Sequence, residues 1–342
     1  MISLPPPFPD TAPEGFPAID PALDTDFDPA IHLALEIPTE IYSLADLGYD
    51  GQTIANAPCP TAATSCFRIL SDEGVQALQR AAQGLEPYCR DLQRISRAVR
   101  GGVYQSRFLK GLCLSPEVTA HCAAIMGLPL HPHSLPHQLG HLNYTPKTPG
   151  ENVDKWHVDT LRFDYVLFVT DPKSVEGGEF QYFKGTKDDM ERLYREGAPF
   201  PEDRLVSPDI PGPGYAVLQQ GNLVVHRAKG LDHARMKKAT YSGMERITMV
   251  NGYVPADMRH RDFTAFDQIY KVDPQAVISG EYARHAAWMG TARLNHTLDQ
   301  TPGSCNRQAL AADLRAAAAD LTQAADALEA ASDGKLAHFG DG

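Results

Sequence analysis

Two side chains that commonly bind metals lie two residues apart in the segment Trp156-His157-Val158-Asp159. The segment opens a run of β-branched and aromatic residues that is typical of a strand. In a strand, residues i and i+2 point to the same side, so His157 and Asp159 would project together and bind one cation. A second histidine would complete two imidazoles and one carboxylate, which leave three positions of an octahedral ion open. His-x-Asp alone is a weak signal, because such a pair is also common at an exposed strand end.

Two histidines further along the chain could complete this ligand set. His226 ends the segment YAVLQQGNLVVH (residues 215–226), in which a Gly-Asn pair predicts a hairpin turn between two antiparallel strands. His233 instead lies in a stretch rich in Lys and Arg without an alternating apolar pattern. We predict His226 as the third ligand, because open positions on a metal require ligands on a rigid support. His233 is the alternative.

Arg246 and Thr248 are spaced to face the same side of a later strand, within the segment ERITMVNGY. A guanidinium group can bind a carboxylate through two parallel, charge-assisted hydrogen bonds, and a neighbouring hydroxyl adds a further donor. This pair predicts a buried carboxylate ligand close to the metal. The alternative is an arginine on a solvated strand face.

The order of these motifs resembles the Fe(II)/2-oxoglutarate-dependent dioxygenase superfamily, most closely its phytanoyl-CoA-hydroxylase-like and natural-product branches. The resemblance is carried by WHVDTLRFDYVLFVTDP, GGEFQYFKGT, YAVLQQGNLVVHRA and MERITMVNGYV, over roughly residues 130–255. In this chain the stretch between His226 and Arg246 is longer than the short hairpin usual in the family, and it contains His233.

The resemblance implies a double-stranded β-helix of the jelly-roll, cupin-like kind, with Fe(II) bound by His157, Asp159 and His226. It further implies that 2-oxoglutarate chelates the iron, that its distal carboxylate meets Arg246 and Thr248, and that O2 is the oxidant. The products would be succinate, CO2 and an oxidised small molecule, such as an amino acid derivative or a natural-product intermediate.

Halogenases of this superfamily have a small residue where this chain has Asp159. Hydroxylation, desaturation or oxidative cyclisation of an unactivated C–H bond is therefore expected, not halogenation. The alternatives are a cupin-like metal enzyme that does not use 2-oxoglutarate and a non-catalytic β-helix that binds a ligand or a partner.

Three further polar residues are candidates for the same pocket. In GHLNY (residues 140–144), His141 and Asn143 would share a strand face. The resemblance suggests that Asn143 contacts 2-oxoglutarate or substrate, and His141 is a candidate substrate contact. Arg162 could pair with an acidic group on the substrate, with an exposed ion pair as the alternative. The other histidines of HPHSLPHQLGH are expected to be surface or packing residues, because two prolines interrupt the segment and no carboxylate accompanies it.

The rest of the chain must position these residues. Short strand-like runs between residues 130 and 255 indicate a barrel or sandwich, so we expect a mainly β fold with helical flanks. The expected parts are an N-terminal arm (1–55), a helical support region (56–128), the catalytic core (129–256) and a C-terminal helical segment (257–342).

Helix signals mark both flanks. Ser71 and Asp72 are N-cap candidates for a helix, and a second helix is expected to begin at Ser115-Pro116 and stop at Gly127. An Ala-rich helix near the C-terminus has leucines on one face, which predicts that it packs against the chain or against a second copy in a homodimer. These leucines are Leu310, Leu314, Leu321 and Leu328.

Composition restricts the partners. The formal net charge is −12 and there is no run of Lys and Arg, which argues against nucleic acid. No apolar stretch is long enough to span a bilayer, and the N-terminal residues lack the pattern of a signal peptide, so a cytoplasmic location is expected. The cysteines are scattered without a C-x-x-C pair and are expected to be reduced thiols. They are Cys59, Cys66, Cys89, Cys113, Cys122 and Cys305.

Overall fold

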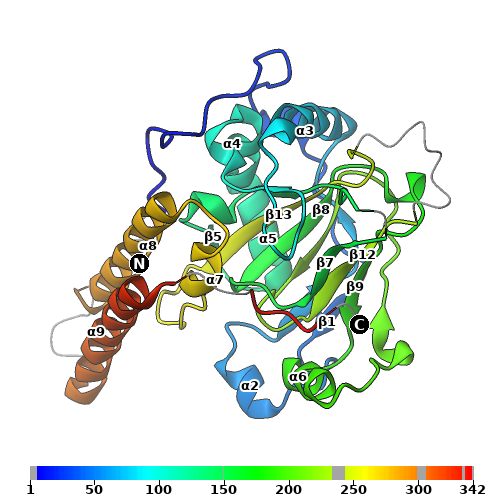
Figure 1. The fold of residues 1–342 in the computed structure, drawn as a ribbon. Coiled ribbons are helices and arrows are strands. Elements are labelled where there is room, and N and C mark those ends of the chain that lie inside the picture. The colour runs from blue at the N-terminus through cyan, green and yellow to red at the C-terminus, as the bar shows by residue number, and fades with distance from the viewer. Residues whose placement is uncertain (1–5, 149, 233–242, 299–305, 333–335, 341–342) are drawn as a thin grey trace.

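Two antiparallel sheets form the centre of the molecule, and helices lie around them (Figure 1). The structure is a computed structural model that describes residues 6–148, 150–232, 243–298, 306–332 and 336–340. In this part of the chain helices contain more residues than strands. The fold is therefore mixed α/β, and the prediction of a mainly β fold is wrong. The long flanking helices account for the difference.

The larger sheet has nine strands. Its order is β1 (Ile41–Ser43), β2 (Thr61–Thr64), β11 (Tyr215–Gln219), β8 (Phe163–Phe168), β13 (Thr248–Pro255), β6 (His141–Asn143) and β4 (Ala98–Val99), with β3 (Phe67–Arg68) beside β11 and β5 (Leu130–Pro132) beside β13. Every residue of β8 is buried, as expected for a central strand that is covered on both faces.

The smaller sheet has four strands and contains His157 and His226. Its order is β10 (Leu205–Val206), β9 (Phe180–Phe183), β12 (His226–Gly230) and β7 (Asn152–His157). Val166 and Phe168 of the larger sheet belong to one apolar cluster with Phe180 and Tyr182 of the smaller sheet. The two sheets are therefore held together by a shared hydrophobic core.

The predicted hairpin between residues 215 and 226 does not form. β11 pairs with β8 in the larger sheet, whereas β12 pairs with β7 and β9 in the smaller one. The Gly-Asn pair does make a turn, in which the N–H groups of Leu223 and Val224 both donate to the carbonyl of Gln220. This turn carries the chain from one sheet to the other, so His226 begins a strand and does not end one.

The helices of the N-terminal half follow their sequence signals. They are α1 (Pro29–His32), α2 (Gly51–Asn56), α3 (Asp72–Leu85), α4 (Arg107–Cys113) and α5 (Pro116–Met126). Ser71 caps α3 by accepting a hydrogen bond from the N–H of Gly74, and α5 ends at Gly127 in the left-handed conformation, both as predicted. The arm before α1 packs on this region, where the N–H of Ile19 donates to the carbonyl of Gln105.

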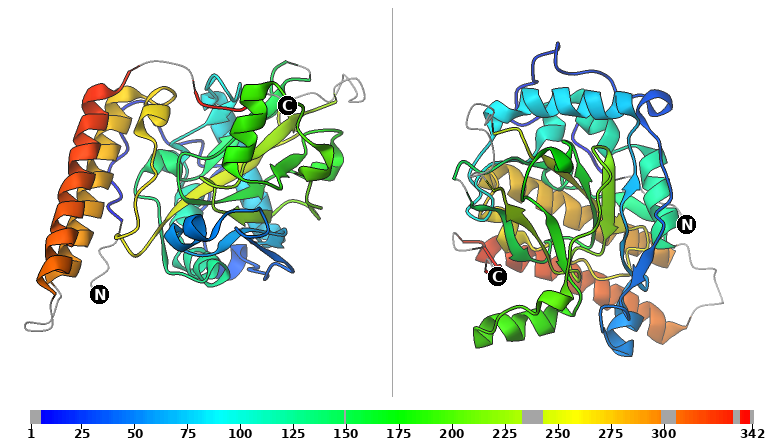
Figure 2. Two further views of the ribbon diagram at one scale, coloured as in Figure 1. Left: turned by 90° about the horizontal axis from the view of Figure 1, so that it is seen from below. Right: turned by 90° about the vertical axis from the view of Figure 1, so that its right-hand side faces the viewer.

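The C-terminal helices are α7 (Phe266–Tyr270), α8 (Gln275–Leu298) and α9 (Arg307–Ala330), while α6 (Lys187–Glu196) lies beside the smaller sheet. α8 and α9 lie side by side at one edge of the molecule (Figure 2). Ala317 and Ala324 are the buried residues of α9, whereas Leu314 and Leu321 are 50% and 41% exposed. The predicted burial within the chain is therefore wrong for Leu314 and Leu321, although Leu321 lies against Gly290 of α8 and Leu328 packs on the apolar cluster of α7 and α8. Burial against a second copy stays a prediction.

Two further predictions concern membrane-spanning segments and the state of the cysteines. Among the described residues, no helix is long and apolar enough to cross a membrane. The five cysteines in the described ranges are free thiols, as expected, and Cys305 lies outside those ranges.

Candidate metal centre and its cavity

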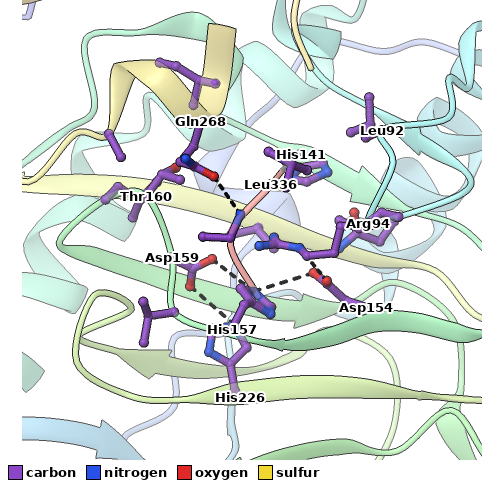
Figure 3. Close-up of a pocket in the computed structure, with 18 of the residues that line it drawn as sticks. Leu92, Arg94, His141, Asp154, His157, Asp159, Thr160, His226, Gln268 and Leu336 are labelled. Carbon is purple, nitrogen blue, oxygen red and sulfur yellow. Dashed lines mark hydrogen bonds and ion pairs between the residues drawn. The ribbon is translucent and has the colours of Figure 1, made fainter. Parts of the chain in front are cut away.

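His157, Asp159 and His226 form a buried group that could hold a metal ion (Figure 3). β12 pairs with β7 so that His226 lies opposite His157, with ring centroids 4.2 Å apart. Asp159 Oδ1 is 3.5 Å from His157 Nε2, and Asp159 Oδ2 is 3.4 Å from His226 Nε2. One ligand atom of each residue lies within 4.8 Å of the other two. The predicted distal ligand, His226, thus meets the His-x-Asp pair.

Backbone carbonyls orient both imidazoles. His157 Nδ1 donates to the carbonyl of Lys155 (2.7 Å), and His226 Nδ1 donates to the carbonyl of Val224 (3.0 Å). A neutral imidazole that donates from one nitrogen keeps the other as a metal ligand. Burial lowers the pKa of His226 to about 4, so this ring is neutral near pH 7, as metal binding requires.

Asp159 was predicted to lie on a strand with His157, but it lies two residues beyond the end of β7. β7 ends at His157, with a register irregularity just before it, and Asp159 is held in the following loop because its N–H donates to the carbonyl of Gly221 (2.8 Å). A Cβ at Gly221 would come within 2.6 Å of Asp159 Oδ2, so only glycine fits there. Burial opposes ionisation of Asp159, but His226 and His157 outweigh it and hold its pKa well below the usual range.

Two buried polar residues that support Asp159 were not predicted. Gln219 Nε2 donates to Asp164 Oδ1 (3.0 Å) and to Asp159 Oδ2 (3.3 Å). Burial and the Asp159 carboxylate raise the pKa of Asp164 well above its usual range. A single Asp inside the apolar run FDYVLF, and a Gln at the end of YAVLQ, were the available signals, because polar residues in buried strands need partners.

A cavity of about 510 Å³ adjoins the metal group. This volume lies within the usual range for small-molecule sites. Arg246, Thr248, Asn143 and His141 line it together with the three candidate ligands. Most of the predicted site residues therefore meet in one cavity, although they come from both sheets. The apolar part of its wall includes Leu92, Ile95, Leu161, Phe263, Ile269 and Leu336.

Arg246 is buried in this cavity wall just before β13 begins. Its Nε donates to the carbonyl of Gly178 (2.6 Å), and its Nη1 lies 3.4 Å from Thr248 Oγ1. Gly178 adopts a φ of 72°, and a Cβ there would lie 2.8 Å from the Arg246 side chain, so glycine is needed for this contact. Burial lowers the pKa of Arg246 to about 10, and the group therefore remains charged at neutral pH.

Of the three additional candidate residues, two line the cavity and one does not. Asn143 pairs with Thr248 across β6 and β13, and His141 lies two residues away in the same wall. Arg162 does not line the cavity. Its guanidinium lies 4.3 Å from the ring centroid of Phe263 and donates to the carbonyl of Arg261 (2.9 Å). It supports Phe263, which does line the cavity.

An ion pair in the cavity wall was also not predicted from the sequence. Arg94 Nε lies 2.6 Å from Asp154 Oδ1, and Asp154 Oδ2 lies 3.5 Å from His157 Nε2. Figure 3 shows the pair beside the metal group. Arg94 and Asp154 are distant in sequence and belong to no motif, so only the tertiary structure reveals their contact.

The histidines of residues 131–137 pack and do not form a second metal site. His133 stacks on His285, with ring centroids 4.7 Å apart, and His137 Nδ1 lies 2.8 Å from Glu281 Oε1. Across the described ranges, the group at His157 is the one cluster of three or more metal-binding side chains that the structure contains. These packing roles agree with the expectation from the prolines.

Residues 336–340 return from the C-terminal helices to cover part of the cavity (Figures 2 and 3). The N–H of Ala337 donates to Gln268 Oε1 (2.8 Å), and the N–H of Phe339 donates to the carbonyl of Trp156 (2.6 Å). The N–H of Trp156 in turn donates to the carbonyl of Gly340 (3.1 Å). The tail is thus bonded to the residue that precedes His157.

Deleting residues 332–342 is expected to open the cavity without destroying the metal group. Metal affinity should stay within about threefold of the intact chain, because the deletion removes none of the three ligand side chains. Hydrogen exchange of the Trp156 amide should rise, since its acceptor on Gly340 is removed. Exchange measured by mass spectrometry on a peptide containing residue 156 tests this. Unchanged exchange would mean that the tail does not bind there in solution.

The choice between the two histidines gives a second prediction. His226→Ala should lower metal affinity by roughly a hundredfold or more, because it removes one of the three converging ligand atoms. His233 lies outside the described residues, and His233→Ala serves as the matched control, with metal affinity unchanged. Metal titration of both variants checks this, and the opposite pattern would make His233 the ligand.

No family model matches the chain, and the search of curated proteins returned no match. Any function of the cavity is therefore inferred from the side chains that line it.

Proposed function

We propose that the protein is an Fe(II)- and 2-oxoglutarate-dependent oxygenase that acts on a small molecule. The observation that carries the proposal is that a buried His-Asp-His group and a buried, charged Arg246 line the same cavity. The first is a ligand set suited to Fe(II) with open positions. The second is suited to the distal carboxylate of a bound dicarboxylic acid, whose charge must be paired away from water.

The residues of the cavity fit this cosubstrate. His157 and His226 would hold the iron through Nε2, because the Nδ1 atom of each ring is bonded to a backbone carbonyl. Asp159 would hold it through its carboxylate, which Gln219 supports. Arg246 and Thr248 would bind the distal carboxylate of 2-oxoglutarate. Asn143 Oδ1 is buried and has no partner among the described residues, so it would accept a hydrogen bond from a donor on the substrate or from water.

Iron, 2-oxoglutarate and O2 together supply an oxidant that can remove hydrogen from an unactivated C–H bond. In a hydroxylation, one oxygen atom of O2 enters succinate and the other enters the product, while 2-oxoglutarate loses CO2. The protein excludes water and holds the C–H bond near the metal. The tail of residues 336–340 and the apolar wall serve the first purpose.

The two sheets would then be the two faces of a double-stranded β-helix. Their strands are all antiparallel, and an apolar cluster joins the sheets. The metal ligands come from the smaller sheet and the turns beside it, whereas Thr248 begins β13 of the larger sheet and Arg246 lies two residues before it. Such an arrangement supports a rigid metal site between two sheets.

Succinate formation tests the proposal. The protein is loaded with Fe(II) and 2-oxoglutarate without oxygen, and then O2 is added. Succinate should form in proportion to the bound iron even without substrate, through slow uncoupled turnover, and it should be absent from the Asp159→Ala variant. Iron binding without any succinate would instead favour a cupin-like metal enzyme that does not use 2-oxoglutarate.

A further inference from the structure

A second group of hydrogen-bond donors lies in the cavity wall, apart from the pair at Arg246 and Thr248. Arg100 follows β4 directly, and His141 begins β6, which pairs with β4. His141 lies opposite Val250, two residues further along β13 than Thr248. Both Arg100 and His141 line the cavity. They therefore occupy a different part of its wall from the proposed 2-oxoglutarate anchor.

Arg100 is a buried cation with an unused donor. Its Nε lies 2.9 Å from each carboxylate oxygen of Asp273. Its Nη2 is buried and has no hydrogen-bond partner in the described part of the chain. A buried guanidinium N–H without a partner is costly, so an acceptor is expected to reach it.

His141 supplies a second donor beside it. Arg100 Nη1 lies 3.4 Å from His141 Nδ1, and a guanidinium can only donate, so Nδ1 must be the acceptor. Burial, followed by the charge of Arg100, lowers the pKa of His141 well below its usual range, so the ring is neutral. The hydrogen of the neutral ring is then on Nε2, which is also buried and without a partner among the residues described.

The charge balance around these donors is positive. Asp273 is fully buried and is shared by two guanidinium groups, because Arg90 Nη2 also approaches it at 3.4 Å. Arg94 has its own carboxylate in Asp154, and Arg246 would be matched by 2-oxoglutarate. The single carboxylate of Asp273 is thus shared by two guanidinium groups, which favours a negatively charged ligand at Arg100.

The wall around these donors is apolar. Leu92 and Ile95 form a small cluster with Ala98, which precedes Arg100, and Val272 packs on the same cluster. Leu92, Ile95 and Val272 line the cavity, and so does Leu336 of the tail. Figure 3 shows Leu92 and His141 on one side of the cavity and Leu336 between them and the metal group. A hydrocarbon or aromatic body would be buried here.

We propose that the substrate of this cavity is a monocarboxylic acid with an apolar body, whose carboxylate accepts hydrogen bonds from Arg100 Nη2 and His141 Nε2. The apolar body then extends towards the metal group and presents a C–H bond remote from the carboxylate. This inference rests on the proposed function for the reaction, although acid binding itself depends only on Arg100 and His141.

Matched acids and amides test the proposal. The probes are decanoate and 3-phenylpropanoate with their primary amides, titrated calorimetrically into protein saturated with Mn(II) and 2-oxoglutarate. The acids should bind at least about tenfold more tightly than the amides, because only the acids bring a negative charge to the buried guanidinium group of Arg100. Arg100→Gln should remove this preference. Arg107→Gln is the control, since Arg107 is an exposed arginine of α4 paired with Asp26.

His141 gives a second pair of variants in case loss of Arg100 disturbs Asp273. His141→Leu should weaken acid binding about tenfold, whereas His141→Gln keeps an N–H donor and should weaken it less. Both variants should bind Mn(II) and 2-oxoglutarate with the affinity of the unaltered chain. Equal affinity for acids and amides, no binding of any probe, or a preference that persists in both Arg100→Gln and His141→Leu would overturn the proposal.

Failure of the proposed function gives a different pattern. If the unaltered chain binds neither Mn(II) nor 2-oxoglutarate, the oxygenase proposal fails. The same acids and amides titrated into the metal-free chain still decide whether Arg100 and His141 form a carboxylate site.

Discussion

Asp159→Ala is expected to lower metal affinity by roughly a hundredfold or more and to abolish succinate formation. Residues that only support metal ligands already contribute about ten- to a hundredfold to affinity, and Asp159 supplies the single carboxylate of the group. His157→Ala should have a similar effect. The fold should persist, because Asp159 lies in a loop and its side chain is 17% exposed. Calorimetric metal titration and circular dichroism measure the two properties.

Asp171→Ala is a suitable control for this experiment. Asp171 is also a loop aspartate, but its carboxylate accepts a hydrogen bond from the N–H of Lys173 at the molecular surface. Its loss should leave metal affinity unchanged. Full iron-dependent turnover in Asp159→Ala would show that the metal is bound by other residues.

Arg246→Leu is expected to weaken 2-oxoglutarate binding by at least about a hundredfold while the metal still binds. The reason is that the variant leaves a buried carboxylate unpaired, and breaking a buried ion pair costs about 3–5 kcal/mol. Arg246→Lys should restore part of the affinity, because it keeps the charge but not the two parallel hydrogen bonds. Titration of 2-oxoglutarate into the Mn(II)-loaded variants gives both values.

Arg162→Leu is the matched control for Arg246. Burial lowers the pKa of both arginines to about 10, but Arg162 does not line the cavity. Its replacement should change the affinity for 2-oxoglutarate by less than about threefold. If Arg246→Leu and Arg162→Leu behave alike, neither residue is the specific anchor.

The sequence predicts which side chains lie together in the site better than it predicts the pairing of the strands. His157 and Asp159 are close in the chain, and residue types that bind metals are rare in apolar runs, so the ligand set is visible locally. The pairing partner of a strand is not. The Gly-Asn pair predicts a turn at residues 221–222 correctly, but turn chemistry is the same whether the chain folds back on itself or crosses to another sheet.

The support around the ligands could not be predicted because it is formed by distant residues. Gln219 reaches Asp164 and Asp159 only because β11 and β8 are neighbours. Arg94 and Asp154 meet across a loop and a strand that share no motif. The tail at residues 336–340 shows neither helical nor strand periodicity, and its place over the cavity depends on single backbone contacts.

The C-terminal helix shows a different limit of periodicity. The leucines of α9 recur with helical spacing, which predicts an amphipathic helix correctly. Ala317 and Ala324 lie on the same face as the leucines, because these positions are spaced by three and four residues. Periodicity therefore predicts the face that packs on α8, but not that the alanines are buried while Leu314 and Leu321 stay 50% and 41% exposed. Small side chains allow two helices to approach closely, so they occupy the contact.

A crystal structure of the protein with Mn(II) and 2-oxoglutarate tests the central proposal most directly. The expected result is an anomalous peak bounded by Nε2 of His157, Nε2 of His226 and the carboxylate of Asp159. Density for 2-oxoglutarate should run from this peak to the guanidinium of Arg246. A metal bound by other residues, or a metal at this group with 2-oxoglutarate absent at saturating concentration, would contradict the proposal.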